Sequence, residues 1–319
     1  MAHKLKGGSL SSTWYHDGPS PFVRKEISTK LNREYGYVRW YSQLKKLQRY
    51  NKLYPDLFPK VLEVGSNDDT AYFDLEYLRG FRDVKSVLVD QSVSEEKLVN
   101  AIWKAFDQLH STTFATATGL TGLYCQEEVK QKLVDACKFD AFAKFNKHDT
   151  FVYFDSTVPN LMSFIDRVSD YLNNVLLYTE SHTHGNPTLE NMMYSPSEDR
   201  VMFIDLYEES IIDSDHLDVS QVLQCSNSYY GYINDRTVNV SDNKVWHTLY
   251  IPESFVRFNQ LFMTSLEKRG FDMKLLGVLE ATQFIRMLPF KCAAGEIDKA
   301  KFFYVHACYL LNGIFNGIS

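Results

Sequence analysis

The stretch that most constrains this 319-residue chain runs from residue 181 to residue 210 and reads SHTHGNPTLENMMYSPSEDRVMFIDLYEES. It consists of a turn, a short apolar run, a polar turn and an apolar strand that ends in an acid. Asp205 follows Asn191 by 14 residues, a spacing that predicts a β-hairpin carrying both side chains to one point. Asn offers a neutral oxygen ligand and Asp a charged one, and both suit a hard cation such as Mg²⁺.

Composition excludes some classes of protein without fixing the fold. Hydrophobic residues make up 45% of the chain and charged residues 23%, which is ordinary for a globular protein. The formal net charge is −6, whereas a general nucleic-acid-binding protein has a basic face. The five cysteines form no CxxC pair, and there is neither an apolar run of about 18 residues nor an apolar signal core. We therefore expect a cytoplasmic protein with reduced thiols, no nucleic-acid partner and no membrane insertion.

Residues 1–80 predict a small β-rich lobe. Strand-like runs at residues 11–18 and 21–28 are separated by the turn signal DGPSP, and runs at residues 60–65 and 70–78 are joined by GSNDD, which suits a hairpin loop. Between these pairs, residues 31–50 show helical spacing of apolar side chains. The expected buried stripe of that helix is Leu31, Tyr35, Val38, Tyr41 and Leu44.

Residues 81–319 are mostly helical in pattern. Ser92 and Glu95 have the spacing of a capping box. The helix after them has an expected buried stripe of Leu98, Ile102, Ala105, Phe106 and Leu109. Further helices are expected at residues 160–176, 254–270, 273–288 and 297–315. The expected fold class is therefore α+β and bilobal, with a small N-terminal lobe (1–80) and a large, mostly helical C-terminal lobe (81–319) that carries a two-strand insert.

Candidate residues follow one another in the order in which protein kinases supply the parts needed for phosphoryl transfer from ATP. The reaction needs a cover for the triphosphate, charge neutralisation, metal ligands and a group that positions the acceptor hydroxyl. Gly8 and Ser9 lie in a small-residue stretch, KGGSLSST, whose backbone can approach phosphates. Lys25 lies on the second predicted strand, and Glu34 lies on the following helix. These four residues are the candidates for the nucleotide-binding part of a site.

The segment HGNPTLEN has the arrangement of a catalytic loop. His184 precedes Asn186 by two residues, and Asn191 follows Asn186 by five. Protein kinases place an Asp, then an Asn five residues later, and a second Asp on a later strand end. Asn191 and Asp205 are accordingly the candidate metal ligands, and Asn186 stands where such a loop has its base.

These motifs resemble the aminoglycoside-phosphotransferase and choline-kinase-like family of small-molecule kinases. The family signature is similar to HGDxxxxN followed by xIDxE. FDLEYLRGF resembles the family hinge, AFDQLHSTTF resembles the helix that opens its second lobe, and SDHLDVSQVLQ resembles its GDPxxDLAxxL segment. Within the family, HGNPTLENMMY is most similar to a bacterial branch found with surface-polysaccharide genes. The resemblance covers most of the chain and implies a protein-kinase-like fold.

The resemblance also implies roles for single residues. Lys25 would contact the α- and β-phosphates of ATP and pair with Glu34, and the backbone of Glu76 and Leu78 would hold the adenine. Asn191 and Asp205 would bind Mg²⁺. His184 would brace the loop, Asp218 would be the structural Asp of the DLA-like segment, and Asn186 occupies the position of the catalytic Asp. The chain departs from the family at its N-terminus, where a full glycine-rich loop is missing.

Asn186 is the second departure from the family. An Asn side chain can hydrogen-bond an acceptor hydroxyl but cannot take its proton near neutral pH. Three explanations remain open: an engineered inactive variant, which we favour, a natural nucleotide-binding pseudokinase, and an active enzyme whose loose transition state requires little of a base.

Each candidate has an ordinary structural explanation as well. Lys25 suits a solvated strand, Asn186 before Pro187 suits a turn, and Asn191 and Asp205 suit caps at turn and strand ends. The joint occurrence of all candidates in one order favours an ATP- and Mg²⁺-dependent kinase that acts on a hydroxyl of a sugar, an amino alcohol or a polyol. Aminoglycoside resistance ranks lower, because the acids gather near the predicted metal site rather than in a separate pocket for a cationic drug. The sequence leaves the acceptor, the choice between ATP and GTP, and the oligomeric state open.

Overall fold

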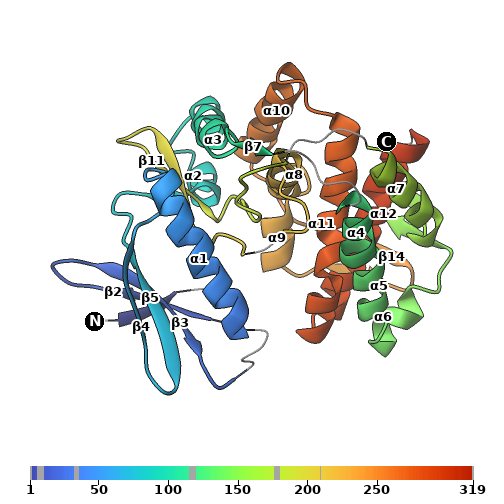
Figure 1. Cartoon of the computed structure of the whole chain (residues 1–319). Helices are drawn as coiled ribbons and strands as arrows, with labels where there is room; N and C mark the ends of the chain where they lie inside the picture. The colour runs from blue at the N-terminus through green and yellow to red at the C-terminus, as the bar shows by residue number, and fades with distance from the viewer. Residues whose placement is uncertain are drawn as a thin grey trace. The chain divides into compact units, whose positions relative to one another are not determined.

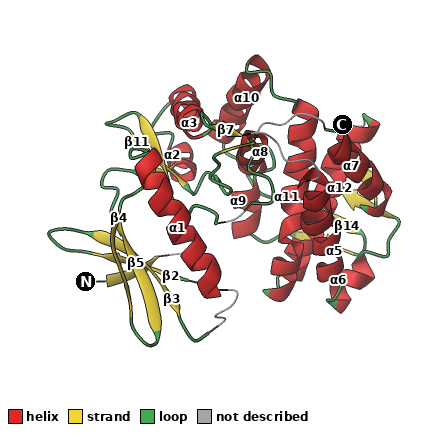
Figure 2. Cartoon of the chain, in the orientation of Figure 1, coloured by secondary structure: helices red, strands yellow, loops and turns green. Residues whose placement is uncertain are grey.

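The computed structural model describes residues 2–5, 11–31, 36–114, 120–175, 180–208 and 210–317. Contacts divide the chain into two compact units, Met1–Thr112 with Thr183–Ser210 and Thr113–His182 with Ile211–Ser319. The N-terminal part is rich in strands and the C-terminal part in helices (Figures 1 and 2), which confirms the α+β class. The lobe boundary at residue 80 stays a prediction. None of the described helices has the length and apolar character needed to cross a bilayer.

A five-stranded antiparallel sheet forms the first part of the first unit. Its strands, in chain order, are β1 (Ala2–Leu5), β2 (Ser12–His16), β3 (Phe22–Ser28), β4 (Val61–Ser66) and β5 (Thr70–Glu76), and their spatial order is β1-β2-β3-β5-β4. The four expected strands are confirmed. β1 was not expected, because its four side chains are all exposed and therefore show no apolar alternation.

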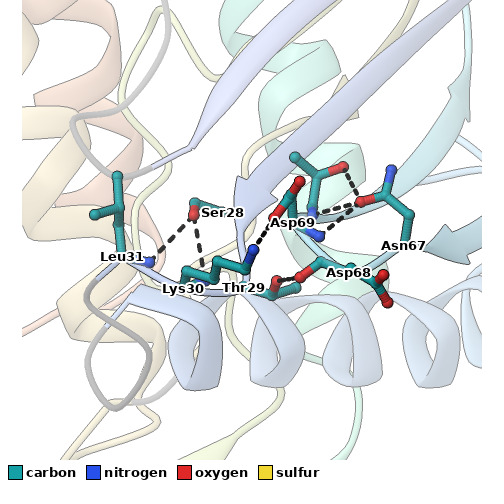
Figure 3. Close-up of polar contacts among 8 residues, drawn as sticks. Ser28, Thr29, Lys30, Leu31, Asn67, Asp68 and Asp69 are labelled. Atoms are coloured by element: carbon teal, nitrogen blue, oxygen red, sulfur yellow. Dashed lines mark hydrogen bonds and ion pairs between the residues drawn. The ribbon is translucent and has the colours of Figure 1, made fainter.

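The hairpin between β4 and β5 closes as the GSNDD signal predicts. The Asn67 side-chain oxygen accepts hydrogen bonds from the backbone N–H groups of Asp69 (2.9 Å) and Thr70 (2.8 Å), which is an Asx turn (Figure 3). The end of β3 is tied to this loop, because Thr29 N–H donates to the Asp69 carbonyl at 2.9 Å. Two turns distant in sequence therefore fix the register of three neighbouring strands.

Helix α1 (Val38–Leu53) buries a different face from the one expected. Its buried side chains are Trp40, Leu44, Leu47 and Tyr50. Of the expected stripe only Leu44 is buried; Leu31, Val38 and Tyr41 are exposed, and Tyr35 lies outside the described residues. The expected stripe was therefore wrong.

The physical reason is that apolar and aromatic side chains occur on several faces of α1. Tertiary contacts select one of them: Trp40 packs on Phe73 of β5 with ring centroids 5.2 Å apart, and Tyr50 packs on Phe58 at 5.4 Å. Successive residues of an α-helix point about 100° apart. Because Trp40 rather than Tyr41 faces the sheet, the buried face of α1 is rotated away from the one expected.

The rest of the first unit consists of β6 (Arg82–Asp83), α2 (Val84–Asp90), α3 (Glu95–Leu109), β11 (Met192–Ser195) and β12 (Arg200–Phe203). The five side chains expected to be buried in α3 are all buried. Its cap is not Ser92 but Ser94, whose hydroxyl accepts a hydrogen bond from Lys97 N–H. The capping-box prediction was wrong because the helix begins at Glu95, so that the N-cap is the residue directly before it.

The second unit is mainly helical. Its helices are α4 (Leu120–Tyr124), a π-helical turn (Cys125–Lys130), α5 (Gln131–Ala136), α6 (Asp140–Phe145), α7 (Met162–Asn174), α8 (Asp215–Ser226), α9 (Tyr230–Asp235), α10 (Glu253–Lys268), α11 (Met273–Ala293) and α12 (Ile297–Asn316). The expected helices correspond to α7, α10, α11 and α12. Gly270 and Gly317 follow α10 and α12 with φ values of +76° and +68°, as expected of helix-ending glycines.

Strands of the second unit were not expected from the sequence. They are β7 (Thr113–Phe114), β8 (Thr150–Tyr153), β9 (Ser156–Pro159), β10 (Glu180–Ser181), β13 (Asn239–Ser241) and β14 (Lys244–Trp246). Four of them form a sheet in the order β13-β14-β8-β9, in which β14 runs parallel to β8. The strands have at most four residues each, too few for an alternation to be recognised.

Candidate functional site

The β11–β12 hairpin brings Asn191 and Asp205 to the same end of two strands. Met192, the first residue of β11, pairs with Phe203, the last residue of β12. One step beyond this pair, Ile204 N–H donates to the Asn191 carbonyl at 2.9 Å. The hairpin that the 14-residue spacing predicts is therefore present, and both candidate metal ligands flank its open end.

His184 holds the preceding loop against the end of β12. Its side chain is fully buried. Nδ1 accepts a hydrogen bond from Asn186 N–H at 3.1 Å, so the ring proton is on Nε2, which donates to the Ile204 carbonyl at 2.8 Å. The backbone adds a third contact, because Tyr207 N–H donates to the His184 carbonyl at 3.0 Å. This is the geometry that a bracing role for His184 requires.

Two residues of the site have a left-handed backbone. Gly185 has φ +81°, and a Cβ at this position would lie 2.9 Å from Tyr207 Cβ and 3.0 Å from Ser210 Oγ. Asp205 has φ +55°. Glycine adopts this region without steric cost, whereas Asp tolerates it at some cost. Five other described non-glycine residues share this conformation, two of them Asp, and Asp is among the residues that adopt it most often.

Asn191 secures the loop with its nitrogen and keeps its oxygen for another partner. Its Nδ2 donates to the Asn186 carbonyl at 2.9 Å, and the same carbonyl accepts from Thr188 N–H at 2.9 Å. Among the described residues no donor contacts Asn191 Oδ1. Asn186 and Asn191 are both half-buried, so the loop is packed on one side and accessible on the other.

Lys25 meets Asp205 directly. β3 places Lys25 opposite Phe73 of β5, and its Nζ lies 2.5 Å from Asp205 Oδ1. The Lys25 side chain is 14% exposed and that of Asp205 is 42% exposed. Desolvation of the Asp205 carboxyl opposes its ionisation, but the charge of Lys25 and the hydrogen bonds from Lys25 and Gln43 outweigh it and lower the pKa. Asp205 is therefore an anion at neutral pH.

Helix α1 contributes contacts that the sequence did not predict. Gln43 Nε2 donates to the Leu206 carbonyl at 2.6 Å and lies 3.3 Å from Asp205 Oδ1. Lys46 Nζ donates to the Tyr207 carbonyl at 2.9 Å, and Arg39 forms an ion pair with Glu208. Residues 39, 43 and 46 have the i, i+4, i+7 spacing of one helix face, and that polar stripe was the signal for these contacts.

The two candidate ligands suit a magnesium ion, because both offer oxygen atoms and each has one oxygen without a hydrogen-bond partner among the described residues. Lys25 and Gln43 both donate to Oδ1 of Asp205, and Oδ2 has no hydrogen-bond partner among the described residues. Asn191 Oδ1 is likewise uncontacted in the described part of the chain. One carboxylate and one amide oxygen are what Mg²⁺ takes when water and phosphate oxygens complete its shell.

Comparisons with known proteins support the fold. No family model and no curated protein matches the sequence. Among solved structures, a fructosamine-3-kinase-like protein from Haemophilus somnus 129PT has a TM-score of 0.55 at 14% identity, over 99% of this chain and 91% of that one. A second fructosamine-3-kinase-like protein, from Thermobifida fusca YX-ER1, has a TM-score of 0.53 at 10% identity, over 96% of this chain and 93% of that one. APH(2'')-IIa in a ternary complex with streptomycin and ATP has a TM-score of 0.50 at 12% identity, over 95% of this chain and 93% of that one.

The chain has a protein-kinase-like fold. This confirms the fold that the resemblance implies, and it is the fold of small-molecule kinases of the fructosamine-3-kinase and aminoglycoside-phosphotransferase types. At these identities the similarity establishes the fold and leaves the reaction and acceptor of this chain to other arguments.

The residues expected to hold the adenine, Glu76 and Leu78, lie at the last position of β5 and two residues beyond it. Glu76 N–H donates to the Lys60 carbonyl at 2.9 Å, so this group is already used by the protein. The Leu78 carbonyl accepts from Phe81 N–H at 3.2 Å, whereas Leu78 N–H has no acceptor among the described residues. Leu78 N–H therefore remains a donor for an adenine ring, and the assignment of Glu76 and Leu78 stays a prediction.

Three candidates for nucleotide binding lie outside the described residues. These are Gly8, Ser9 and Glu34. Asp218 belongs to the second unit, where it is fully buried in the first turn of α8.

Several cationic and aromatic side chains of the second unit, which are types of residue that could bind an acceptor, make contacts within that unit. Arg286 forms an ion pair with Glu128 at 2.9 Å, and Lys291 forms one with Glu296 at 2.7 Å. Tyr230 packs on Phe303 with ring centroids 5.7 Å apart. These contacts are those of ordinary structural residues, and they leave the acceptor site unassigned.

Proposed function

We propose that this chain is a phosphotransferase that binds ATP and Mg²⁺ and acts on a hydroxyl of a small molecule. The observation that carries the proposal is the convergence of Lys25, Asp205 and Asn191. The first two lie 2.5 Å apart, and the third is tied to the residue before Asp205 by a 2.9 Å hydrogen bond. The kinase-like fold and the free oxygens of Asp205 and Asn191 support it.

Each residue has a definite part in this function. Lys25 binds the α- and β-phosphates, which requires its ammonium to move from Asp205 to the nucleotide. Asp205 and Asn191 would hold Mg²⁺, which supplies neutralisation of phosphate charge when bound. His184 keeps the loop in place through Ile204, and Asn186 orients the acceptor hydroxyl by a hydrogen bond.

Asn186 limits the rate in this proposal, because its amide cannot accept a proton. A general base contributes roughly 10²- to 10⁴-fold to a rate. The proposed form of the protein therefore binds nucleotide and turns over slowly, as an engineered or natural inactive variant would. The proposed acceptors are a sugar, an amino alcohol or a polyol, in a cytoplasmic pathway that supplies surface polysaccharide.

Restoring the carboxylate tests this function. ATP consumption by wild type and Asn186→Asp is measured against a panel of sugars, amino alcohols and polyols. The panel also includes a fructosamine and streptomycin, which appear in the names of the structural neighbours. The expected result is an acceptor-dependent gain of about 10²-fold or more with one class of acceptor.

A nucleotide-binding pseudokinase is the second candidate, and the Asn at position 186 favours it. Such a protein would bind ATP with an affinity similar to that of a kinase and serve a regulatory or scaffolding role. If Asn186→Asp binds ATP but gains no turnover with any acceptor, the pseudokinase replaces the enzyme as the better description.

A further inference from the structure

The side chain of helix α1 that reaches the Lys25–Asp205 pair is an amide. In the described part of the helix, Gln43 is the residue in contact with Asp205, at 3.3 Å from Oδ1. A Gln side chain carries two N–H groups on one nitrogen and no charge. One N–H donates to the Leu206 carbonyl at 2.6 Å, and the other points to the Asp205 carboxylate. Gln43 thus bridges the side chain of one residue and the backbone of the next.

The bridge acts on a residue with a left-handed backbone. Asp205 has φ +55° and lies two residues beyond the end of β12. Lys25 and Gln43 approach the same oxygen, Oδ1, from β3 and from α1. Two donors on Oδ1 fix the rotation of the carboxylate and leave Oδ2 directed elsewhere.

The contact excludes an acidic or an aliphatic side chain at position 43. A carboxylate at position 43 would lie beside the Asp205 carboxylate and the Leu206 carbonyl, and like charges at about 3–4 Å repel strongly in a partly buried site. It would also compete with Asp205 for Lys25. An aliphatic side chain would leave the Leu206 carbonyl without its donor, and Leu206 is buried. The Gln43 amide nitrogen, with its two N–H groups, serves both partners.

We propose that Gln43 is a positioning residue that orients Asp205 for the metal ion. The proposal rests on the proposed function, because it concerns the same ligand. Arg39 and Lys46 lie one turn before and one turn after Gln43, and their described contacts are with Glu208 and with the Tyr207 carbonyl. Gln43 therefore has an effect on the metal that its neighbours on α1 lack.

The test separates metal-dependent from metal-independent binding of ATP. Calorimetry gives the dissociation constant of ATP with MgCl₂ and with EDTA for wild type, Gln43→Leu, Gln43→Glu and Lys46→Met. We expect Gln43→Leu to weaken ATP binding about tenfold with MgCl₂ and little with EDTA, since Lys25 still binds the phosphates. Gln43→Glu should weaken binding with MgCl₂ further. Lys46→Met loses a contact to the same segment and should keep the wild-type ratio of the two constants.

Each outcome decides one claim. If both Gln43 variants keep the wild-type ratio, or lose affinity equally with and without Mg²⁺, Gln43 has a structural role only and the inference is wrong. The same holds if both variants fail to fold. If wild type binds no ATP under either condition, the proposed function itself is wrong.

Discussion

Glu280 in α11 gives the sharpest prediction for the stability of this protein. Its side chain is buried, and its partners are neutral: Ser228 Oγ donates to Oε1 at 2.5 Å, and Asn227 Nδ2 lies 3.1 and 3.2 Å from the two oxygens. Among the described residues no Lys, Arg or His forms an ion pair with it. Burial raises the pKa of Glu280 from 4.5 to about 7, although the hydrogen bonds from Ser228 and Asn227 oppose this rise.

The direction of the pH effect follows from proton binding. Between about pH 4.5 and pH 7 the native protein keeps a proton on Glu280 that the unfolded chain has lost. The free energy of unfolding therefore falls as the pH rises through this window and levels off above it. A pKa difference of this size corresponds to about 3 kcal/mol.

Glu280→Gln measures this contribution. The amide mimics the protonated carboxyl and does not titrate, so any cost of fitting its NH₂ group is the same at every pH. Urea unfolding of wild type and variant at pH 5 and pH 8 gives two differences in the free energy of unfolding. Between pH 5 and pH 8, we expect the free energy of unfolding of the variant to rise by about 2–3 kcal/mol relative to that of wild type.

The control is Glu267→Gln, which changes an exposed glutamate near the end of α10 in the same unit. The free energy of unfolding of this control should stay within about 0.5 kcal/mol of the wild-type value at both pH values. If the Glu280→Gln difference is as independent of pH as that of the control, Glu280 is ionised in the native protein and the reasoning from burial is refuted.

The remaining predictions concern the candidate site. Asp205→Ala should abolish the dependence of ATP affinity on Mg²⁺ in calorimetry, and an unchanged affinity would remove its metal role. Lys25→Ala should weaken ATP binding more than it lowers the melting temperature; unfolding without an effect on the nucleotide would make Lys25 a structural residue. Gly185→Ala should destabilise the protein by about 1–3 kcal/mol in urea unfolding, because φ is +81° and the new Cβ would meet Tyr207. Gly18→Ala, where a Cβ meets nothing within 4 Å, is the control and should stay near wild type.

The hairpin of the site could be predicted because local pattern and tertiary role agree there. β12 is a run of apolar residues between a polar turn and Asp205, and both strands are mostly buried. Asn191 and Asp205 therefore had to flank one end of the hairpin once the turn was recognised. The direct ion pair between Lys25 and Asp205 was not predicted. The family resemblance pairs Lys25 with Glu34, which lies outside the described residues.

The face of α1 could not be predicted in the same way. Val38, Tyr41 and Trp40 all qualify as core residues by type, and the choice depends on the ring of Phe73 in a strand that follows later in the chain. The contacts of Gln43 could not be predicted for a related reason. A Gln among Lys and Arg residues is typical of a solvated helix face, and only the contacts with residues 205 and 206 show it to be a half-buried donor.

Two residues of the site have a left-handed backbone, and contacts of neighbouring residues hold them in place. Asp205 and Gly185 both have positive φ, and the hydrogen bond from Tyr207 N–H to the His184 carbonyl joins the two turns. His184 in turn binds Ile204, the residue before Asp205, through Nε2. Each strained residue is thus held by its neighbour's contacts, and an Asp in an unfavourable conformation persists only when surrounding structure fixes it. Three separate elements, β3, α1 and the loop at His184, thus hold the segment around one such Asp.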